Sequence, residues 1–302
     1  MHSRREFLQL AAMSVPSCAA WGAFAADKKD GSVRLGIQTY SFREMLGKPG
    51  DMTDKMIAAM RQLGITECEL WEPTLQPPNL WPPSATEAYR EGVRTWRLGP
   101  GLDDMKAHGE KLKAAGIRVF AFNFGLNDQC NDAEIVRGIE MTHALGAKVM
   151  TVSTTLVMAK RSVPFFEKDG LILGLHGHSN VSDPNQFATP ASFEAGLAMS
   201  KQYRVNLDIG HFTAGGFEPV EFIQKHHDRI TNLHIKDRKR NDGPNVPFGQ
   251  GDTPITAVLQ LLKRERYPIP AFIEYEYPGT GTATEEVGKC LAYVREALAT
   301  TR

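Results

Sequence analysis

Short runs of β-branched and aromatic residues alternate along the chain with longer segments whose apolar residues recur at helical spacing. The short runs predict strands at Val33–Ser41, Glu67–Trp71, Arg118–Phe124, Lys148–Ser153, Leu171–His176, Val205–Ile209, Thr231–Ile235 and Ala271–Tyr275. The longer segments predict helices at Met52–Leu63, Met105–Ala115, Ala133–Leu145, Pro219–His227, Ile255–Leu262 and Glu285–Leu298. Because crossover helices join parallel strands, eight alternating units predict an α/β protein built as a single closed (β/α)8 TIM barrel.

Glycines and prolines mark where the predicted elements end. Gly64, Gly116 and Gly146 each stand between a helical segment and the following strand, as expected of a helix stop. The helix expected at Leu156–Asp169 has the weakest pattern, since Pro164 interrupts it. Irregular stretches at 77–83 and 238–253 follow the second and seventh strands, and loops at that end of a barrel build active sites. No Gly-rich boundary divides the chain, which predicts one domain.

Composition narrows the class of protein. Apolar residues make up 42% of the chain and charged residues 23%, which is typical of a folded globular protein. The 35 basic and 35 acidic residues balance, so nucleic acid is not an expected partner. Cys68, Cys130 and Cys290 are widely spaced without a CxxC pair, which predicts single thiols and neither a disulfide framework nor a structural zinc site.

The N-terminal segment Ser3-Arg4-Arg5-Glu6-Phe7-Leu8 resembles a bacterial twin-arginine export signal. A small-x-small pattern at Ala23-Phe24-Ala25 predicts cleavage after residue 25, with the barrel domain at 26–302 and a periplasmic or secreted location. The alternatives are a frayed basic N-terminus or a lipoprotein cleavage site at Cys18. No later apolar run approaches the roughly 20 residues needed to span a bilayer.

Polar residues gather at the ends of the last four predicted strands, where a purely structural strand would stay apolar. These residues are His176, His178, Asp208, His211, His234, Lys236, Asp237, Glu274 and Glu276. Side chains two positions apart share one side of a strand, so imidazoles and carboxylates can meet at the barrel mouth. This composition predicts a divalent-metal site with nitrogen and oxygen ligands. The alternative is a metal-free pocket whose histidines act as acid and base. Gln38 and Glu69, on the first two strands, are candidate substrate contacts.

The mature chain resembles the xylose-isomerase-like TIM barrels, which include sugar isomerases, ketose 3-epimerases, inosose dehydratases and endonuclease IV. The segments that carry the resemblance are Leu35-Gly36-Ile37-Gln38-Thr39-Tyr40-Ser41, Asp208-x-x-His211, His234-x-Lys236-Asp237 and Phe272-Ile273-Glu274-Tyr275-Glu276. In the epimerase branch, strands five to eight supply Glu, Asp, His and Glu to one metal. The resemblance implies that Asp208, His234 and Glu274 are ligands, and that His211 and Arg240 contact substrate.

The chain departs from the epimerase pattern at strand five, where His176 takes the place of Glu. His176 would retain a metal ligand but remove one of two carboxylates that shuttle protons on opposite faces of the substrate. Glu274 is then the expected base, with His178 or Lys236 as the second acid–base group. Two histidines and two carboxylates suit Mn, Fe, Co or Zn better than Mg or Ca.

The leading hypothesis is an exported, metal-dependent isomerase or epimerase of an unphosphorylated sugar or keto-sugar. A second hypothesis is a lyase or hydrolase that cleaves 3-keto-glycosides by elimination in the same pocket, and a third is a non-catalytic sugar-binding barrel. The endonuclease branch needs a trinuclear site and a DNA-binding surface. The balanced charge and the expected export both oppose that reading.

Overall fold

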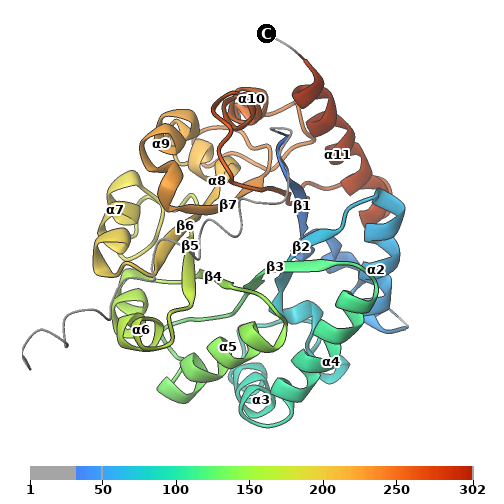
Figure 1. Ribbon diagram of the computed structural model, residues 1–302, viewed down its shortest axis with the longest axis vertical. Coiled ribbons are helices and arrows are strands. Elements are labelled where there is room, and N and C mark those ends of the chain that lie inside the picture. The colour runs from blue at the N-terminus through green and yellow to red at the C-terminus, as the bar shows by residue number, and fades with distance from the viewer. Residues whose placement is uncertain (1–31, 49, 301–302) are drawn as a thin grey trace, which may run out of the picture. The chain divides into compact units, whose positions relative to one another are not determined.

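Eight parallel strands close into a barrel in the computed structural model, which describes residues 32–48 and 50–300 (Figure 1). The strands are β1 (Leu35–Gln38), β2 (Glu67–Trp71), β3 (Arg118–Asn123), β4 (Val149–Ser153), β5 (Ile172–His176), β6 (Tyr203–Asp208), β7 (Ile230–Ile235) and β8 (Ala271–Ile273). They pair in sequence order, and β1 pairs with β8 through Leu35–Ala271 and Ile37–Ile273 to complete the ring. The predicted single (β/α)8 barrel is confirmed.

Helices surround this ring in Figure 1. They are α2 (Met52–Leu63), α3 (Glu87–Leu98), α4 (Gly101–Ala114), α5 (Asp132–Ala144), α6 (Leu156–Asp169), α7 (Pro190–Met199), α8 (Ile209–Ala214), α9 (Pro219–His226), α10 (Ile255–Glu265) and α11 (Ala283–Ala299). Helix α6 covers the whole predicted range and continues through Pro164. Gly64 ends α2 in the left-handed conformation, with φ of 66°, as its predicted stop position requires. Helices α3, α7 and the short α8 are additions to the sequence-based prediction.

Strand ends differ from the predicted ones where a side chain caps the following turn. The Gln38 side chain accepts a hydrogen bond from the Tyr40 N–H, so β1 stops at Gln38 and a 3-10 helix, Thr39–Met45, takes the place of the predicted strand end. Asp208 likewise caps α8, and its Oδ1 accepts from the His211 N–H at 2.7 Å. Strand β8 ends at Ile273, so Glu274 is the first residue beyond it.

A polar layer fills the barrel interior just beneath the strand ends. Glu69, Thr151 and Asn206 come from the even-numbered strands β2, β4 and β6, and all three are buried. Alternate strands contribute the side chains of one layer in such barrels. Below and around this layer, one hydrophobic cluster joins the strands to the helices. The site is therefore built directly above a layer of buried polar side chains.

The loop 238–253 is irregular, as predicted, and Asp237 anchors it. The Asp237 carboxylate accepts hydrogen bonds from the N–H groups of Gly249, Gly251 and Thr253. A Cβ atom on Gly251 would lie 1.9 Å from Asp237 Oδ1, so only glycine fits this contact. Asp237 thus shapes the mouth of the barrel instead of entering the pocket.

Three further predictions concern the rest of the chain. Cys68, Cys130 and Cys290 are free and buried, which confirms the single thiols. No helix within residues 32–48 and 50–300 is long and apolar enough to cross a bilayer. The predicted export signal and Cys18 lie outside the described residues.

Candidate metal centre and sugar pocket

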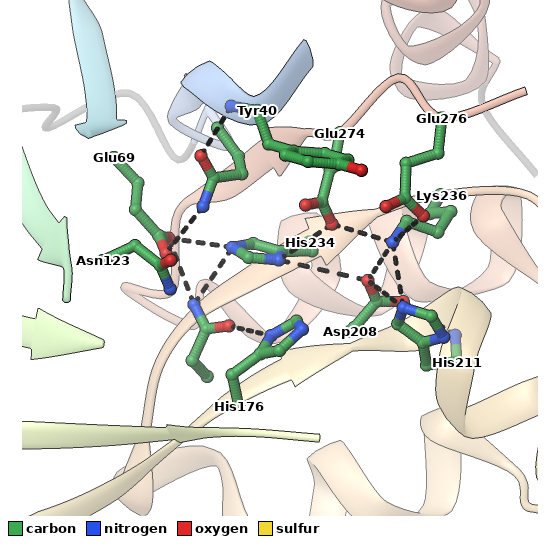
Figure 2. Close-up of polar contacts among 12 residues, drawn as sticks. Tyr40, Glu69, Asn123, His176, Asp208, His211, His234, Lys236, Glu274 and Glu276 are labelled. Atoms are coloured by element: carbon green, nitrogen blue, oxygen red, sulfur yellow. Dashed lines mark hydrogen bonds and ion pairs between the residues drawn. The ribbon is translucent and has the colours of Figure 1, made fainter. Parts of the chain in front are cut away.

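A cavity of about 220 Å³ opens at the carboxyl ends of the strands. The side chains around it come from all parts of the barrel mouth: Gln38, Tyr40, Trp71, Asn123, Ser153, His176, His178, His211, His234, Lys236, Glu274 and Glu276. Ten of the residues at this site are labelled in Figure 2. Most of the sequence-predicted site residues therefore meet in one pocket.

Three buried atoms converge beside this pocket: Asp208 Oδ2, His234 Nδ1 and Glu274 Oε2. Within the described chain, their contacts are ion pairs with one another and with Lys236. His234 Nδ1 lies 3.1 Å from Glu274 Oε2 and 4.0 Å from Asp208 Oδ2, so the three atoms face one another. An imidazole nitrogen and two carboxylate oxygens that converge in this way fit a divalent cation, and they belong to the three ligands that the family resemblance implies.

Ligand-atom spacing indicates two candidate groups at this point of the barrel. Atoms of His176, Asp208 and His234 lie within 4.8 Å of one another, and all three residues are buried. Atoms of His176, His178 and His211 are equally close, but this second group is partly exposed. The first group combines the predicted fourth ligand, His176, with Asp208 and His234, two of the three implied ligands.

Glu69 determines how His234 faces the site. Glu69 Oε2 lies 2.8 Å from His234 Nε2, and a buried carboxylate can only accept, so Nε2 carries the hydrogen and Nδ1 is turned toward the other ligands. Burial opposes ionisation of Glu69, but the charge and hydrogen bond of His234 outweigh it and hold the pKa of the carboxyl below its usual range. Burial likewise opposes a charge on His234, but Glu69 and Glu274 raise its pKa well above the usual value.

Lys236 places a positive charge beside the same carboxylates. Its Nζ lies 2.9 Å from both Asp208 Oδ2 and Glu274 Oε2 and 2.6 Å from Glu276 Oε2. Burial disfavours the ammonium ion, but the three carboxylates together raise the pKa of Lys236 above its usual range. Burial would raise the pKa of Glu274, but Lys236 and then His234 lower it instead. With Lys236 and His234 both protonated, the site carries two positive charges. The surrounding carboxylates outnumber them, so negative charge remains for a metal ion, which would take the place of the proton on His234 Nδ1.

Hydrogen bonds orient the other imidazoles. His176 Nδ1 lies 2.7 Å from the amide oxygen of Asn206, so Nδ1 donates and Nε2 is left for the pocket. Arg238 Nη1 lies 2.7 Å from His211 Nδ1, and because arginine has no acceptor, that nitrogen of His211 accepts. Burial, Lys236 and His178 together lower the pKa of His211 well below its usual value. Both rings are thus fixed in orientation by neighbours outside the pocket.

His178 stands at the exposed mouth of the cavity. In the part of the chain that the structure describes, neither ring nitrogen of His178 has a hydrogen-bond partner. Loss of solvation, reinforced by His176 and Lys236, lowers the pKa of His178 to about 4. A neutral imidazole with two unpaired nitrogens is suited to exchange protons with a bound molecule.

Two predicted substrate contacts lie outside the pocket. Arg240 forms an ion pair with Glu218 and does not line the cavity. Glu69 is fully buried beneath the pocket and orients His234 instead of touching its open space. Gln38 does line the cavity, and its Nε2 donates to Glu69 Oε1 at 3.1 Å.

Four lining residues are absent from the sequence-based prediction: Tyr40, Trp71, Asn123 and Ser153. Asn123 and Ser153 are the last residues of β3 and β4, so they occupy the same strand-end position that singled out the histidines and carboxylates. The polar residues at the ends of β3 and β4 are the sequence signal that could have identified Asn123 and Ser153. Tyr40 and Trp71 pack edge to face, with ring centroids 4.7 Å apart.

Comparison with known proteins agrees with this architecture. The profile of a protein family described as xylose isomerase-like TIM barrel matches residues 57–297. No curated protein matches the chain with significance.

Solved structures share the fold at low sequence identity. A 3-keto-D-glucoside 4-epimerase from E. coli is 15% identical, with a TM-score of 0.61 and coverage of 88% of this chain and 100% of that one. A sugar phosphate isomerase/epimerase from Parabacteroides distasonis is 19% identical, with a TM-score of 0.61 and coverage of 88% and 97%. A xylose isomerase domain protein from Alicyclobacillus acidocaldarius is 14% identical, with a TM-score of 0.62 and coverage of 88% and 98%.

Proposed function

Because the chain belongs to the xylose isomerase-like TIM barrel family, we propose that it is an exported, divalent-metal-dependent isomerase or epimerase. Its substrate would be an unphosphorylated sugar or keto-sugar, from which the enzyme removes a proton beside a carbonyl group. The observation that carries this proposal is the convergence of three buried atoms, Asp208 Oδ2, His234 Nδ1 and Glu274 Oε2, on one point at the barrel mouth.

These three residues, with His176, would hold the metal. Two imidazoles and two carboxylates suit Mn, Co, Zn or Fe. A divalent cation bound there supplies positive charge to an oxygen of the substrate, which stabilises the negative charge that develops when a neighbouring proton leaves. The Glu69–His234 hydrogen bond supports this role, because it fixes the imidazole with Nδ1 toward the ligand set.

Proton transfer would be carried out by side chains on two sides of the cavity. Glu274 lies just past β8 and is the proposed base, with Lys236 beside it as a donor held in its charged form by carboxylates. His178 lies past β5, at the mouth, with its ring nitrogens unpaired in the described chain. Acid–base groups on opposite sides are what an epimerase needs to remove a proton from one face of a carbon and return it to the other.

The polar lining favours an uncharged sugar. Apart from the histidines, Lys236 is the single cationic side chain among the residues that line the cavity, and it is already paired with Asp208, Glu274 and Glu276. A phosphate group would therefore meet carboxylates and no free cation, whereas sugar hydroxyls can both donate to and accept from this lining. Export through the signal-like segment Ser3–Leu8 would also place the enzyme away from most phosphorylated sugars.

Elimination from a 3-keto-glycoside is the alternative that the site favours next. Its first step is the same proton removal beside a carbonyl. His176 is the residue that favours this alternative. The epimerases that the chain resembles carry a glutamate at this position of β5, so a histidine here makes the two sides of the pocket chemically different. Mass spectrometry of products from free sugars and 3-keto-glycosides separates the two reactions, because isomerisation keeps the mass and elimination releases the aglycone.

The metal is tested directly by His234→Ala. Removing His234 Nδ1 from the ligand set should lower the metal content, measured by elemental analysis, well below one ion per chain. His143→Ala is the matched control, because this exposed histidine pairs with Asp169 far from the site and should leave metal content unchanged. Full occupancy in His234→Ala would place the metal elsewhere. A wild-type protein that binds no metal would favour the non-catalytic sugar-binding barrel.

A further inference from the structure

A second cavity, of about 150 Å³, adjoins the candidate sugar pocket. Trp71 and Asn123 line both cavities, so these two side chains form the boundary between them. The second cavity lies among the segment that follows β2, the helix α3 and the loop that follows β3. It is thus on the same face of the barrel as the proposed chemistry, and a molecule longer than one sugar ring can reach both.

Two residues that line this second cavity have hydrogen-bond donors that the described chain does not use. Gln76 is only 4% exposed, and its Oε1 accepts from the Tyr89 hydroxyl at 3.0 Å. Its amide Nε2 donates to no atom of the described residues. The Tyr89 hydroxyl fixes the orientation of this amide, and its Nε2 donor therefore remains available to a ligand in the cavity.

Arg90 provides a second donor. Its guanidinium contacts the Ala85 carbonyl, and among the described residues it has no carboxylate partner. The neighbouring arginines differ, since Arg94 pairs with Glu91 and Glu134, and Arg97 pairs with Glu134 and a second buried glutamate. Arg90 therefore retains N–H groups that a ligand can use.

We propose that the substrate is a glycoside of two sugar rings, with the reacting ring in the candidate sugar pocket and the second ring in the cavity lined by Gln76, Tyr89 and Arg90. The bond between the rings would pass Trp71 and Asn123. This inference rests on the proposed function for the identity of the first ring. Hydroxyl groups of the second ring would accept from Gln76 and Arg90, and the Trp71 ring would pack against its carbon skeleton.

Binding of unreactive sugars to the full-length protein tests the second ring apart from any reaction. Isothermal titration would compare methyl β-glucoside with cellobiose, and methyl α-glucoside with maltose. We expect one disaccharide to bind about ten-fold more tightly than its methyl glycoside, because one or two added hydrogen bonds contribute about 1 kcal/mol each. Phenyl β-glucoside, whose second ring has no hydroxyl groups, should lack this advantage.

Two variants test whether residues of the second cavity cause the tighter binding of the disaccharide. Gln76→Leu and Arg90→Met remove donors while keeping side-chain length, and each should bring the ratio of the two affinities toward one. Arg264→Met is the matched control, since Arg264 is exposed and pairs with Glu265 away from the cavity. Thermal unfolding of each variant confirms that the protein is folded at the temperature of the titration.

Several outcomes would overturn the two-ring proposal. These are equal affinities for methyl glycosides and disaccharides, a ratio that neither variant changes, a phenyl glucoside that binds as tightly as cellobiose, or no binding of any of these sugars. A different result separates the proposed function from this inference. If the affinity ratio behaves as expected but the 3-keto forms yield neither isomer nor cleavage product, the second cavity stands and the proposed reaction fails.

Discussion

Glu69 connects five strands of the barrel through one carboxylate. Oε1 accepts from Gln38 and Thr151, and Oε2 accepts from Asn206, Asn232 and His234. Because every neighbour acts as a donor, the group at this position must carry acceptors on both of its terminal atoms. The orientation of a metal ligand therefore depends on a residue that never reaches the pocket.

Glu69→Gln should weaken metal binding without removing a ligand. An amide N–H₂ in place of either oxygen would face a donor, so the His234 ring would lose its fixed orientation. Loss of such an orienting partner typically lowers metal affinity about 10- to 100-fold, and a competition titration with a chelating dye would measure it.

Thr151→Val is the control for that substitution. Thr151 is also fully buried and donates to Glu69 at 2.6 Å, but on Oε1, the oxygen that does not contact His234. We expect a loss of stability with nearly wild-type metal affinity. Equal metal affinity in Glu69→Gln and wild type would show that His234 needs no orienting carboxylate.

Glu274→Gln tests the proposed base. The glutamine keeps the size of the side chain and one oxygen ligand, but it cannot accept a proton, so turnover should fall about 100- to 10,000-fold. Substrate binding should persist when metal is present.

Exchange of the substrate proton with deuterated solvent measures the same step directly. If the metal-replete variant exchanges that proton at the wild-type rate, the base is elsewhere, and His178 becomes the next residue to substitute. Glu276→Gln provides the matched control, since this carboxylate also contacts Lys236.

Site residues could be predicted from the sequence where a histidine or a charged residue stands at the end of a strand. Imidazoles and carboxylates after β5 to β8 stand out because a structural strand would be apolar there. The role of Glu69 could not be predicted, since its five partners lie on four other strands and meet only when the barrel closes. The position of Arg240 could not be predicted either. It lies in an irregular loop, where it forms an ion pair with Glu218 outside the cavity.

At the scale of elements, the helix α3 and the helix α5 are joined by a buried ion cluster. Arg97 on α3 pairs with Glu72, which follows β2, and with Glu134 on α5, and all three side chains are at most 5% exposed. Glu134 also accepts from the N–H of Asn131, completing a capping box at the start of α5. This cluster forms one wall of the second cavity.

Glu134→Gln should destabilise the protein by about 3 kcal/mol at neutral pH, because it leaves buried Arg97 with one carboxylate fewer. Burial opposes ionisation of Glu134, but the Asn131 N–H and the two arginines hold the pKa of its carboxyl below the usual range. A depressed folded-state pKa means that this stabilisation is complete above the unfolded pKa of about 4.3. It decreases as pH falls through the lower folded-state value.

Urea unfolding at pH 7 and at pH 4 measures this dependence. The difference between wild type and Glu134→Gln should shrink at the lower pH. Glu91→Gln is the control, since this largely exposed carboxylate contacts only the outer face of Arg94, and it should change stability little at either pH. A difference that grows in acid would contradict the assigned direction.

The pattern of apolar residues predicted the strands better than it predicted two of the helices. Helix α3 has few apolar positions, because Arg97 takes a buried place that a hydrophobic residue would normally fill. Helix α7 is short and carries small residues on most of its faces, so no apolar stripe stands out. Tertiary contacts, and not helical periodicity, stabilise both segments.

At the scale of the whole molecule, export would require both guanidinium groups of the Arg4-Arg5 pair. Replacing both arginines with lysine should leave uncleaved precursor in the cytoplasm, because lysine keeps the charge but not the planar group. Cell fractionation with an antibody against the barrel would measure it. A variant of Lys28 and Lys29 to alanine serves as the control, and unchanged export of the Arg4-Arg5 variant would exclude the twin-arginine route.

Because β1 pairs with β8, the barrel cannot close until β8 has been synthesised. Arg43 and Tyr275, which bond across this junction, are 232 residues apart in the chain. A ribosome adding about 5–20 residues per second makes β1 roughly 10 to 50 seconds before β8. During that interval one edge of β1 has no partner, and an unpaired strand edge invites pairing with another chain. Glu274 emerges at the end of the same interval, so the nascent protein acquires its last proposed ligand only as the ring closes.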